Sequence, residues 1–404
     1  MRKGVRTSAK TRTRQALIKF VYGPQASSRA GESLRRRVRD GGEIRRILVV
    51  RPDHLGDLLF ATPALERVRK AFPGAHITGA VGPWGRAMWE GNRSINALYA
   101  ISFPGIKAKK ERWPLAPYAL LNQHASWLYH RRYDLGIILR FDHWWGAALL
   151  WAAGVPRRWG YDTPGMGAWL TNSVPYIEGR HEVEQNLALV EPVVQKYVER
   201  ARLQRMGGVE IARGKGIPAL RPPHQASLPT GLADGWLTAQ KRVVIHPGTA
   251  AANKLWTIDG WAEVASRLGD EGWSVALTGS PDEERLADAI VSRVEETPLL
   301  NLVGKTASLG QLISVLGAAH MVLGVDSGPL HIATALGKPT LHLYGPSDER
   351  IWGPWGNSYK HRVLRAPGTM PTMHLEVGSP ALEGGPDMRA ITVEMVMHEV
   401  KALV

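Results

Sequence analysis

Residues 44–65 read IRRILVVRPDHLGDLLFATPAL. Within this stretch, Ile47–Val50 form a short β-branched apolar run that is typical of a buried strand in a parallel sheet. A polar loop follows and reaches Asp57. A helix is predicted next, with Thr62 as its N-cap and Pro63 at its first position. The stretch therefore predicts a strand, a loop and a helix in succession, which is the repeating unit of an α/β fold.

The alternation of strands and helices continues along the chain in two blocks. In the first block, further strands are predicted at His76–Val81 and Leu135–Leu139. In the second block, strands are predicted at Val243–Ile245, Val275–Leu277, Leu300–Val303, Met321–Val325 and Pro339–Tyr344. Helical spacing of apolar residues separates these strands. We therefore predict two Rossmann-like domains, each with a parallel sheet covered by helices on both faces.

The sequence predicts four regions. Residues 1–44 are a basic and flexible N-terminal arm, residues 45–205 and 241–404 are the two Rossmann-like domains, and residues 206–240 are a linker. The linker is predicted because Gly and Pro crowd this stretch and apolar periodicity is weak. Since ligands bind at the carboxyl ends of the strands in such sheets, we expect the site in a cleft between the two domains.

The composition is that of a globular protein: of 404 residues, 44% are hydrophobic and 22% are charged. The chain has no cysteine, which excludes a disulfide framework, a thiolate metal site and a cysteine nucleophile. Its net charge of +15 favours anionic partners such as nucleotide phosphates, nucleic acid or an anionic membrane surface.

Most of this charge lies in the first 46 residues, which hold 14 Lys and Arg against three acidic residues. Three interpretations of the arm stay open: a solvated disordered segment, a short helix near Arg12–Tyr22 on anionic lipid, or a nucleic-acid contact. No signal peptide and no run of about 18 apolar residues is present. We expect a cytoplasmic protein with possible peripheral contact at the inner face of the membrane.

In the first domain, the loop after the first strand lacks the G-x-G-x-x-G pattern of dinucleotide-binding folds. It carries instead a carboxylate, Asp57, at the junction of strand and helix. A carboxylate there can act as a general base toward a substrate hydroxyl, or it can cap the following helix. Asp53 and His54 are weaker candidates in the same loop. Arg140, Asp142 and His143 follow a later strand and are either acceptor contacts or ordinary surface residues.

In the second domain, three loops follow predicted strands. Thr249 and Lys254 suit a phosphate, because one donates a hydrogen bond and the other supplies positive charge. A carboxylate among Asp282, Glu283 and Glu284, with Glu283 favoured, suits ribose hydroxyls or a helix N-terminus. The third loop places small residues between a strand and a helix, where free N–H groups bind anions; its candidates are Asp326, Ser327, Gly328 and His331.

Together these loops describe a nucleoside-diphosphate site in one domain and a carboxylate base in the other. That combination is typical of a sugar-nucleotide glycosyltransferase. In such an enzyme the base deprotonates the acceptor, and the other site stabilises the leaving diphosphate. We expect no cofactor and no metal, because lysine and backbone dipoles supply the positive charge and no Asp-x-Asp motif stands in either loop.

The sequence resembles glycosyltransferase family 9, the ADP-heptose:lipopolysaccharide heptosyltransferase family. The resemblance covers about residues 44–355. Its blocks are Ile47–Leu59 with Thr62–Leu65, His246–Thr249 with Lys254–Trp256, and Gly324–His331 with Gly337–Thr340 and Tyr344–Pro346.

The resemblance implies a GT-B fold, two Rossmann-like domains facing across a cleft, and an inverting, metal-independent transfer. A heptose or hexose would move from a nucleoside-diphosphate sugar, expected to be ADP-linked, to a glycolipid or cell-envelope glycan. By position, the resemblance makes Asp57 the general base and Thr249 and Lys254 the contacts of the donor diphosphate. It also assigns Asp326, Ser327, Gly328 and His331 to the donor loop and Glu283 to the ribose.

Other functions stay open at this stage. A different GT-B sugar-nucleotide enzyme, such as a non-hydrolysing epimerase, would use a similar fold. A catalytically silent family member that binds nucleotide or glycolipid is a non-enzymatic alternative. A nucleic-acid-binding function would rest on the arm alone, because no recognisable reading module is present.

Overall fold

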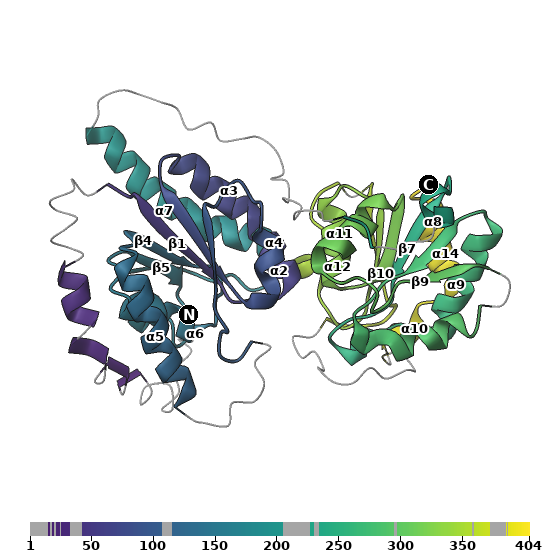
Figure 1. The fold of residues 1–404 in the computed structure, drawn as a ribbon, viewed down its shortest axis with the longest axis horizontal. Helices are drawn as coiled ribbons and strands as arrows, with labels where there is room; N and C mark the ends of the chain where they lie inside the picture. The colour runs from purple at the N-terminus through teal and green to yellow at the C-terminus, as the bar shows by residue number, and fades with distance from the viewer. Residues whose placement is uncertain are drawn as a thin grey trace. The chain divides into compact units, whose positions relative to one another are not determined.

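The computed structural model describes residues 15–16, 18–19, 22–24, 26–32, 43–106, 115–204, 227–229, 234–294, 297–357, 359–371, 385 and 387–404. The chain divides into two compact units, Met1–Lys215 and Gly216–Val404 (Figure 1). Each unit holds one six-stranded sheet. The two-domain α/β fold predicted from the sequence is confirmed.

The sheet of the N-terminal unit has the strand order β3-β2-β1-β4-β5-β6, and all its neighbours pair in parallel. The strands are β1 (Arg46–Arg51), β2 (His76–Val81), β3 (Ala97–Ala100), β4 (Leu135–Ile138), β5 (Arg158–Tyr161) and β6 (Asn172–Val174). The apolar run of β1 lies in the middle, where Ile47 is in register with Ile77 on one side and Leu135 on the other. Its loop therefore opens at the switch point of the sheet, where ligands bind in such folds.

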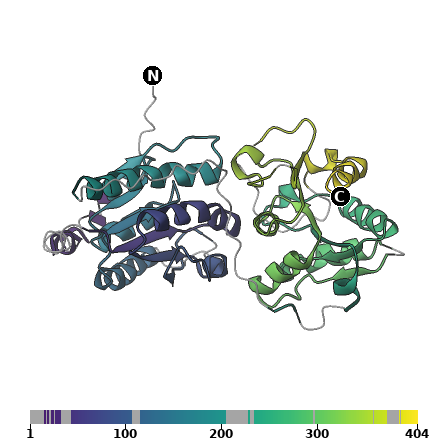
Figure 2. The same cartoon turned by 90° about the horizontal axis from the view of Figure 1, so that it is seen from above.

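Helices cover both faces of this sheet (Figure 2). They are α2 (Leu55–Phe60), α3 (Thr62–Ala71), α4 (Arg86–Trp89), α5 (Ala116–His130), α6 (Trp144–Ala152) and α7 (Glu182–Gln204), with short 3₁₀ turns at Pro83–Gly85 and Gly167–Trp169. Leu48 and Val50 of β1 pack with residues of α5 and α6 in one apolar cluster. Helices α3 and α7 contact each other and α7 also contacts β5. The alternation of β1 side chains between two covered faces explains why its sequence is apolar throughout.

A short helix that the sequence does not predict, α2, precedes the predicted helix α3. Asp57 lies in the first turn of α2 rather than in a loop, and Thr62 is the first residue of α3 rather than its N-cap. The N-cap prediction for Thr62 is wrong because its hydroxyl donates to the carbonyl of Leu59, 2.7 Å away, in the preceding turn. Ala61, in a helical conformation, joins the two helices directly.

The arm was expected to be flexible, but its described part packs against the N-terminal unit. The described residues between Gln15 and Glu32 are helical. Ile18 is 1% exposed and belongs to the apolar cluster of α5 and α6. The guanidinium of Arg29 donates to the carbonyl of Ala152 at 2.8 Å and to the hydroxyl of Ser126 at 3.0 Å. For these residues the prediction of a solvated arm is wrong, because their apolar and arginine side chains have partners on the unit.

The sheet of the C-terminal unit has the order β12-β11-β10-β7-β8-β9, again parallel throughout. The strands are β7 (Arg242–His246), β8 (Ser274–Leu277), β9 (Leu299–Asn301), β10 (Met321–Val325), β11 (Thr340–Tyr344) and β12 (His361–Arg365). The helices are α8 (Asp234–Thr238), α9 (Ile258–Asp270), α10 (Glu284–Val291), α11 (Leu309–Ala318), α12 (Gly328–Ala335), α13 (Glu349–Trp352) and α14 (Val393–Lys401). Short 3₁₀ turns lie at Ala252–Lys254, Pro281–Glu283 and Asp387–Ala390.

The end of the predicted linker belongs to this second unit. Trp236 of α8 is 2% exposed, and its indole N–H donates to the carbonyl of Ser274 at 3.1 Å. An indole ring of this size removes substantial apolar surface from water. Residues 234–240 are therefore part of the packed unit, and the rest of the predicted linker lies outside the described residues, apart from 227–229.

No helix within the described ranges combines the length and the apolar character that crossing a bilayer requires.

Candidate active site

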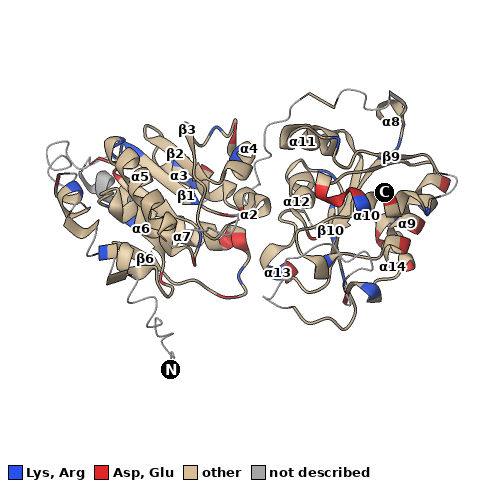
Figure 3. Cartoon of the chain, turned by 60° about the horizontal axis from the view of Figure 1, so that its bottom comes forward, with Lys and Arg blue, Asp and Glu red and all other residues tan. Residues whose placement is uncertain are grey.

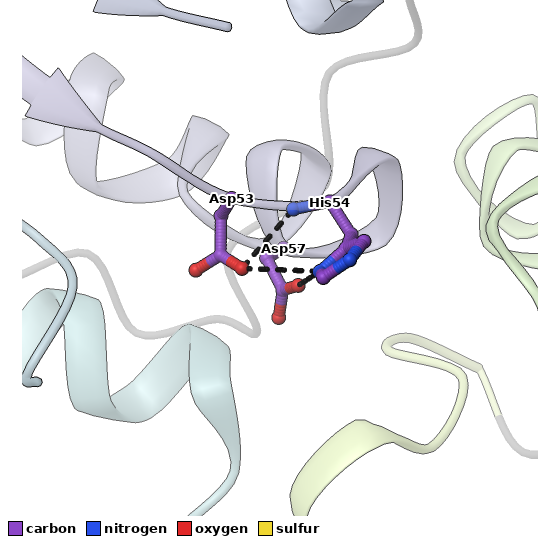
Figure 4. A group of neighbouring side chains, drawn as sticks. All are labelled: Asp53, His54 and Asp57. Atoms are coloured by element: carbon purple, nitrogen blue, oxygen red, sulfur yellow. Dashed lines mark hydrogen bonds and ion pairs between the residues drawn. The ribbon is translucent and has the colours of Figure 1, made fainter. Parts of the chain in front are cut away.

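The first group of candidate residues lies where β1 ends and α2 begins. Asp57 is in the first turn of α2, and Asp53 and His54 precede it in the loop (Figure 4). His54 Nδ1 lies 3.6 Å from Asp53 Oδ1 and 4.0 Å from Asp57 Oδ2. Figure 3 shows acidic residues beside α2. The loop thus gathers two carboxylates and an imidazole at the carboxyl end of the central strand.

A buried arginine holds this group together. Arg51, the last residue of β1, is 2% exposed. Its Nη2 lies 2.9 Å from Glu182 Oε2, 3.1 Å from Asp53 Oδ2 and 3.7 Å from Asp57 Oδ1. Its Nη1 donates to the carbonyl of Leu139 at 2.6 Å and to Asn186 Oδ1 at 2.9 Å. One guanidinium therefore satisfies groups from the loop, from the segment after β4 and from α7.

The two carboxylates of the loop have opposite electrostatic environments. Although burial opposes its ionisation, Asp53 has its pKa lowered well below the usual range by Arg51, with smaller contributions from a hydrogen bond with His54 and from Arg140. Burial raises the pKa of Asp57 well above its usual range, and the neighbouring Asp53 and Glu182 raise it further, whereas Arg51 opposes this. A raised pKa is the property that makes a carboxylate an effective general base.

The three predicted acceptor contacts do not share one environment. Arg140 Nη1 lies 2.7 Å from Asp53 Oδ1, and its Nε donates to Asp142 Oδ1 at 2.6 Å. The structure thus brings Arg140 and Asp142 to the loop of Asp57. His143 is the N-cap of α6: its Nδ1 accepts from the N–H of Gly146 at 3.1 Å, and its Nε2 lies 3.2 Å from the carbonyl of Pro104. Both its ring nitrogens have partners within the unit, so His143 stabilises a helix end.

The second group lies in the C-terminal unit around Asp326, at the end of β10. Lys254 Nζ lies 3.0 Å from Asp326 Oδ2 and 3.1 Å from its carbonyl oxygen. Tyr344 OH donates to Asp326 Oδ1 at 3.2 Å, and His331 Nε2 lies 3.4 Å from the same oxygen. Lys254 and His331 hold the pKa of Asp326 well below its usual range although burial opposes this.

The N-terminus of α12 stands next to this pair. Ser327 is its N-cap and Gly328 its first residue, and the hydroxyl of Ser327 is buried without a hydrogen-bond partner. Thr249 donates to the carbonyl of Asp326 at 3.3 Å. Thr249 and Lys254 therefore lie close to the helix N-terminus that Ser327 and Gly328 form, and this arrangement is suited to an anion.

Glu283 packs over the glycine of the β7 exit loop. Its Oε2 accepts from the backbone N–H of Ser280 at 2.6 Å and from its hydroxyl at 2.9 Å. A Cβ added at Gly248 would lie 1.8 Å from Glu283 Oε1. The carboxylate therefore occupies space that only a glycine leaves open, beside the loop of Thr249.

Nothing in these groups requires a metal. Ligand atoms of Asp53, His54 and Asp57 lie within 4.8 Å of one another, the only such cluster among the described residues. Arg51 and Arg140 already contact the carboxylate of Asp53, so we interpret this cluster as an ion-pair network. The absence of a resident metal stays a prediction.

The sequence pattern of glycosyltransferase family 9 (heptosyltransferase) matches residues 121–377, more than half of the chain. The chain belongs to glycosyltransferase family 9. Lipopolysaccharide heptosyltransferase 3 of Escherichia coli is 29% identical over 311 residues, covering 75% of this chain and 84% of that protein. Lipopolysaccharide heptosyltransferase 1 of Pseudomonas aeruginosa is 28% identical over 335 residues, covering 78% and 83%. The resemblance stated from the sequence motifs is confirmed.

Solved structures of family 9 members share the fold. A family 9 glycosyltransferase from Veillonella parvula superposes with a TM-score of 0.70 at 22% identity, covering 89% of this chain and 97% of that one. E. coli ADP-heptose lipopolysaccharide heptosyltransferase II gives a TM-score of 0.66 at 21% identity, covering 89% and 98%. The GT-B fold is thereby confirmed, and the chain is a glycosyltransferase.

Three residues of these groups are not among the candidates that the sequence predicts: Arg51, Glu182 and Asn186. Arg51 ends an apolar strand, and a charged residue in that position is a signal for a buried ion pair. Glu182 and Asn186 lie more than 100 residues further along the chain, and no local pattern connects them to Arg51.

Proposed function

We propose that this family 9 glycosyltransferase transfers a heptose from an ADP-linked donor to a lipopolysaccharide-type glycolipid with inversion at the anomeric carbon. The observation that carries the proposal is the carboxylate of Asp57, placed at the carboxyl end of the central strand with a raised pKa. Support for the sugar and the nucleotide comes from the relatives, which are lipopolysaccharide heptosyltransferases, and from an E. coli heptosyltransferase solved with ADP.

In this mechanism, Asp57 accepts the proton of an acceptor hydroxyl while the oxygen attacks the anomeric carbon from the face opposite the diphosphate. The bond from that carbon to the diphosphate oxygen breaks, and the electron pair leaves with the nucleoside diphosphate. Lys254, the Thr249 hydroxyl and the N–H groups at the start of α12 stabilise the charge that develops there. Glu283 binds the ribose of the donor, and Arg140 and Asp142 orient the acceptor near Asp57.

The general-base role is tested by Asp57→Asn. Transfer from ADP-heptose to a lipopolysaccharide that lacks its outer heptoses is measured, with the anomeric configuration of the product read by NMR. We expect a loss of about 10²- to 10⁴-fold, because a general base contributes that much. Asp162→Asn is the matched control, since this carboxylate is exposed in the same unit. Near wild-type turnover by Asp57→Asn would exclude the role.

The donor is tested separately by thermal stabilisation with ADP, UDP, GDP and CDP, with and without EDTA. Selective stabilisation by ADP that EDTA leaves unchanged supports an ADP-sugar and a site without metal. Selectivity for another nucleotide would retain the reaction class and change the donor. If no nucleotide stabilises the protein, a catalytically silent member that binds glycolipid becomes the better hypothesis.

A further inference from the structure

The buried guanidinium of Arg51 lies closer to Glu182 and Asp53 than to Asp57. Its Nη2 approaches Glu182 and Asp53 to hydrogen-bond distance, 2.9 and 3.1 Å, but stays 3.7 Å from Asp57 Oδ1. At 3.7 Å the guanidinium attracts the carboxylate but forms no hydrogen bond with it. Arg51 therefore acts on the Asp57 carboxylate through charge and donates no hydrogen bond to this oxygen.

Glu182 is placed to cause this inequality. It is the first residue of α7 and 5% exposed, and a carboxylate in the first turn of a helix is stabilised by the helix dipole. A buried carboxylate also needs a cationic partner, because burying an unpaired charge is costly. The helix dipole and the need for a cationic partner both favour this position of the Glu182 carboxylate. The carboxylate in turn holds Nη2 of Arg51 at 2.9 Å.

A second contact ties α7 to the helix that carries Asp57. Asn186, on the next turn of α7, is fully buried and accepts from Arg51 Nη1. Its amide donates to the carbonyls of Glu182 at 2.7 Å and Phe60 at 3.4 Å. Phe60 is the last residue of α2, so α7 holds both the arginine and the helix of Asp57 in one hydrogen-bonded arrangement.

We propose that Glu182 and Arg51 are positioning residues for Asp57, in which Glu182 holds the guanidinium at a distance where it attracts the Asp57 carboxylate without hydrogen-bonding to it. This inference rests on the proposed base role of Asp57. The charged or titratable groups that face Asp57 are Arg51 from β1, Asp53 and His54 from the loop, Arg140 from the segment after β4, and Glu182 from α7.

The decisive variant is Glu182→Gln. Glutamine keeps the size and an acceptor oxygen but removes the negative charge, so the attraction that draws Nη2 of Arg51 away from Asp57 is weakened, while Asp53 and Asn186 still hold the guanidinium. Both effects stabilise the ionised Asp57 and lower its pKa. We expect the carboxyl ¹³C titration of Asp57, assigned by its loss in Asp57→Asn, to move about one pH unit lower. The acid limb of the kcat/KM profile for heptose transfer moves with it.

Two further variants separate positioning from a general effect on structure. Glu184→Gln changes a carboxylate of the same helix whose side chain is exposed, and its titration and pH profile should coincide with those of the wild type. Glu182→Asp restores the charge, and its profile should lie closer to the wild type than that of Glu182→Gln. Unfolding temperatures of all variants confirm that they are folded.

The outcomes distinguish the two proposals. If Glu182→Gln leaves the Asp57 titration unchanged, the positioning role is overturned, whatever the transfer assay shows. If the titration shifts but the wild type transfers no heptose, the positioning role stands and the proposed reaction fails.

Discussion

At the scale of single residues, the buried pair of Lys254 and Asp326 is the charged centre of the C-terminal unit. Asp326 also accepts from Tyr344, and it lies close to His331. The carboxylate therefore keeps some partners when the lysine is removed. The ammonium has three N–H donors, two of which face Asp326, and we propose that the third contacts the diphosphate of the donor.

Replacing this lysine should reduce stability and ligand binding together. In Lys254→Met, the buried carboxylate loses its cation, which costs about 3 kcal/mol when a buried pair is broken. ADP loses a charge-assisted contact, so we expect its affinity to fall about tenfold or more. Thermal unfolding and calorimetric ADP titration measure the two effects. Lys401→Met, at an exposed position on α14, should change neither; equal ADP affinity in Lys254→Met would contradict the donor role.

Gly248 offers a second test at this scale. In Gly248→Ala, the new methyl group would meet the carboxylate of Glu283 at 1.8 Å. That carboxylate is the far end of a flexible side chain, so we expect the side chain to rotate away and the fold to persist. Affinity for ADP should fall about tenfold, while affinity for inorganic diphosphate, which has no ribose, should change little. Gly235→Ala is the control, because its Cβ would meet nothing within 4 Å.

The candidate site was predictable from sequence where its residues stand in short motifs. Asp57, Thr249, Lys254 and the loop from Asp326 to His331 each follow a recognisable strand, and the structure places the last three groups together. Arg51 and Glu182 were not predictable, because their pairing depends on how α7 packs beside the end of β1. His143 had the appearance of a loop residue, but its ring nitrogens serve a helix end and a backbone carbonyl.

At the scale of elements, central strands were easier to predict than edge strands. β1, β2, β4, β7, β8, β10 and β11 are apolar runs because helices cover both their faces. The edge strands β3, β6 and β12 have partly exposed residues and mixed sequences, so no apolar run marks them. Two strands depart from this rule: the edge strand β9 was predicted from its leucines, and the inner strand β5, with the sequence RWGY, was not predicted. An apolar run in the sequence indicates a buried strand, and edge strands are less buried than inner strands.

The N-cap of α6 makes the N-terminal unit sensitive to acid. Burial lowers the pKa of His143 to about 4, compared with 6.5 in the unfolded chain. Below pH 6.5 the unfolded state therefore binds more protons than the folded state. The stability that neutral His143 contributes is present above pH 6.5 and is lost as the pH falls toward 4. The difference between the two pKa values corresponds to about 3 kcal/mol in the free energy of unfolding.

His143→Asn tests this prediction, because asparagine also caps helices but does not titrate. We expect the free energy of unfolding, measured with urea between pH 7 and pH 4, to fall less steeply in the variant than in the wild type. Parallel curves would show that His143 does not contribute to the acid sensitivity.

At the scale of the whole molecule, the first 32 residues divide into two parts with different expected roles, and six further arginines lie in residues 33–46. Residues 1–14 contain six Lys and Arg and no acidic residue. We propose that they contact an anionic membrane, where each basic residue contributes about 1 kcal/mol. Residues 15–32 include Ile18 and Arg29, which pack against the unit.

Two deletions separate these roles. Deletion of residues 1–14 should leave the unfolding temperature unchanged and weaken binding to vesicles that contain phosphatidylglycerol, with the difference vanishing at high salt. Deletion of residues 1–32 should also destabilise the unit by about 2 kcal/mol or more, because the site of Ile18 loses its occupant. Binding to neutral vesicles that salt does not affect would contradict the electrostatic contact.

The two units are consecutive in the chain, divided between Lys215 and Gly216. Every strand of the first sheet lies before residue 175. Helix α7, which carries Glu182 and contacts Arg51, ends at Gln204. Among the described residues, the first unit therefore has its whole sheet and its last helix in place before β7, the first strand of the second sheet, is synthesised. Because domains fold as units during synthesis, from the N-terminus onward, it can complete its sheet while the second half is still being translated. The strands of the two parallel sheets would then not be unfolded at the same time during synthesis.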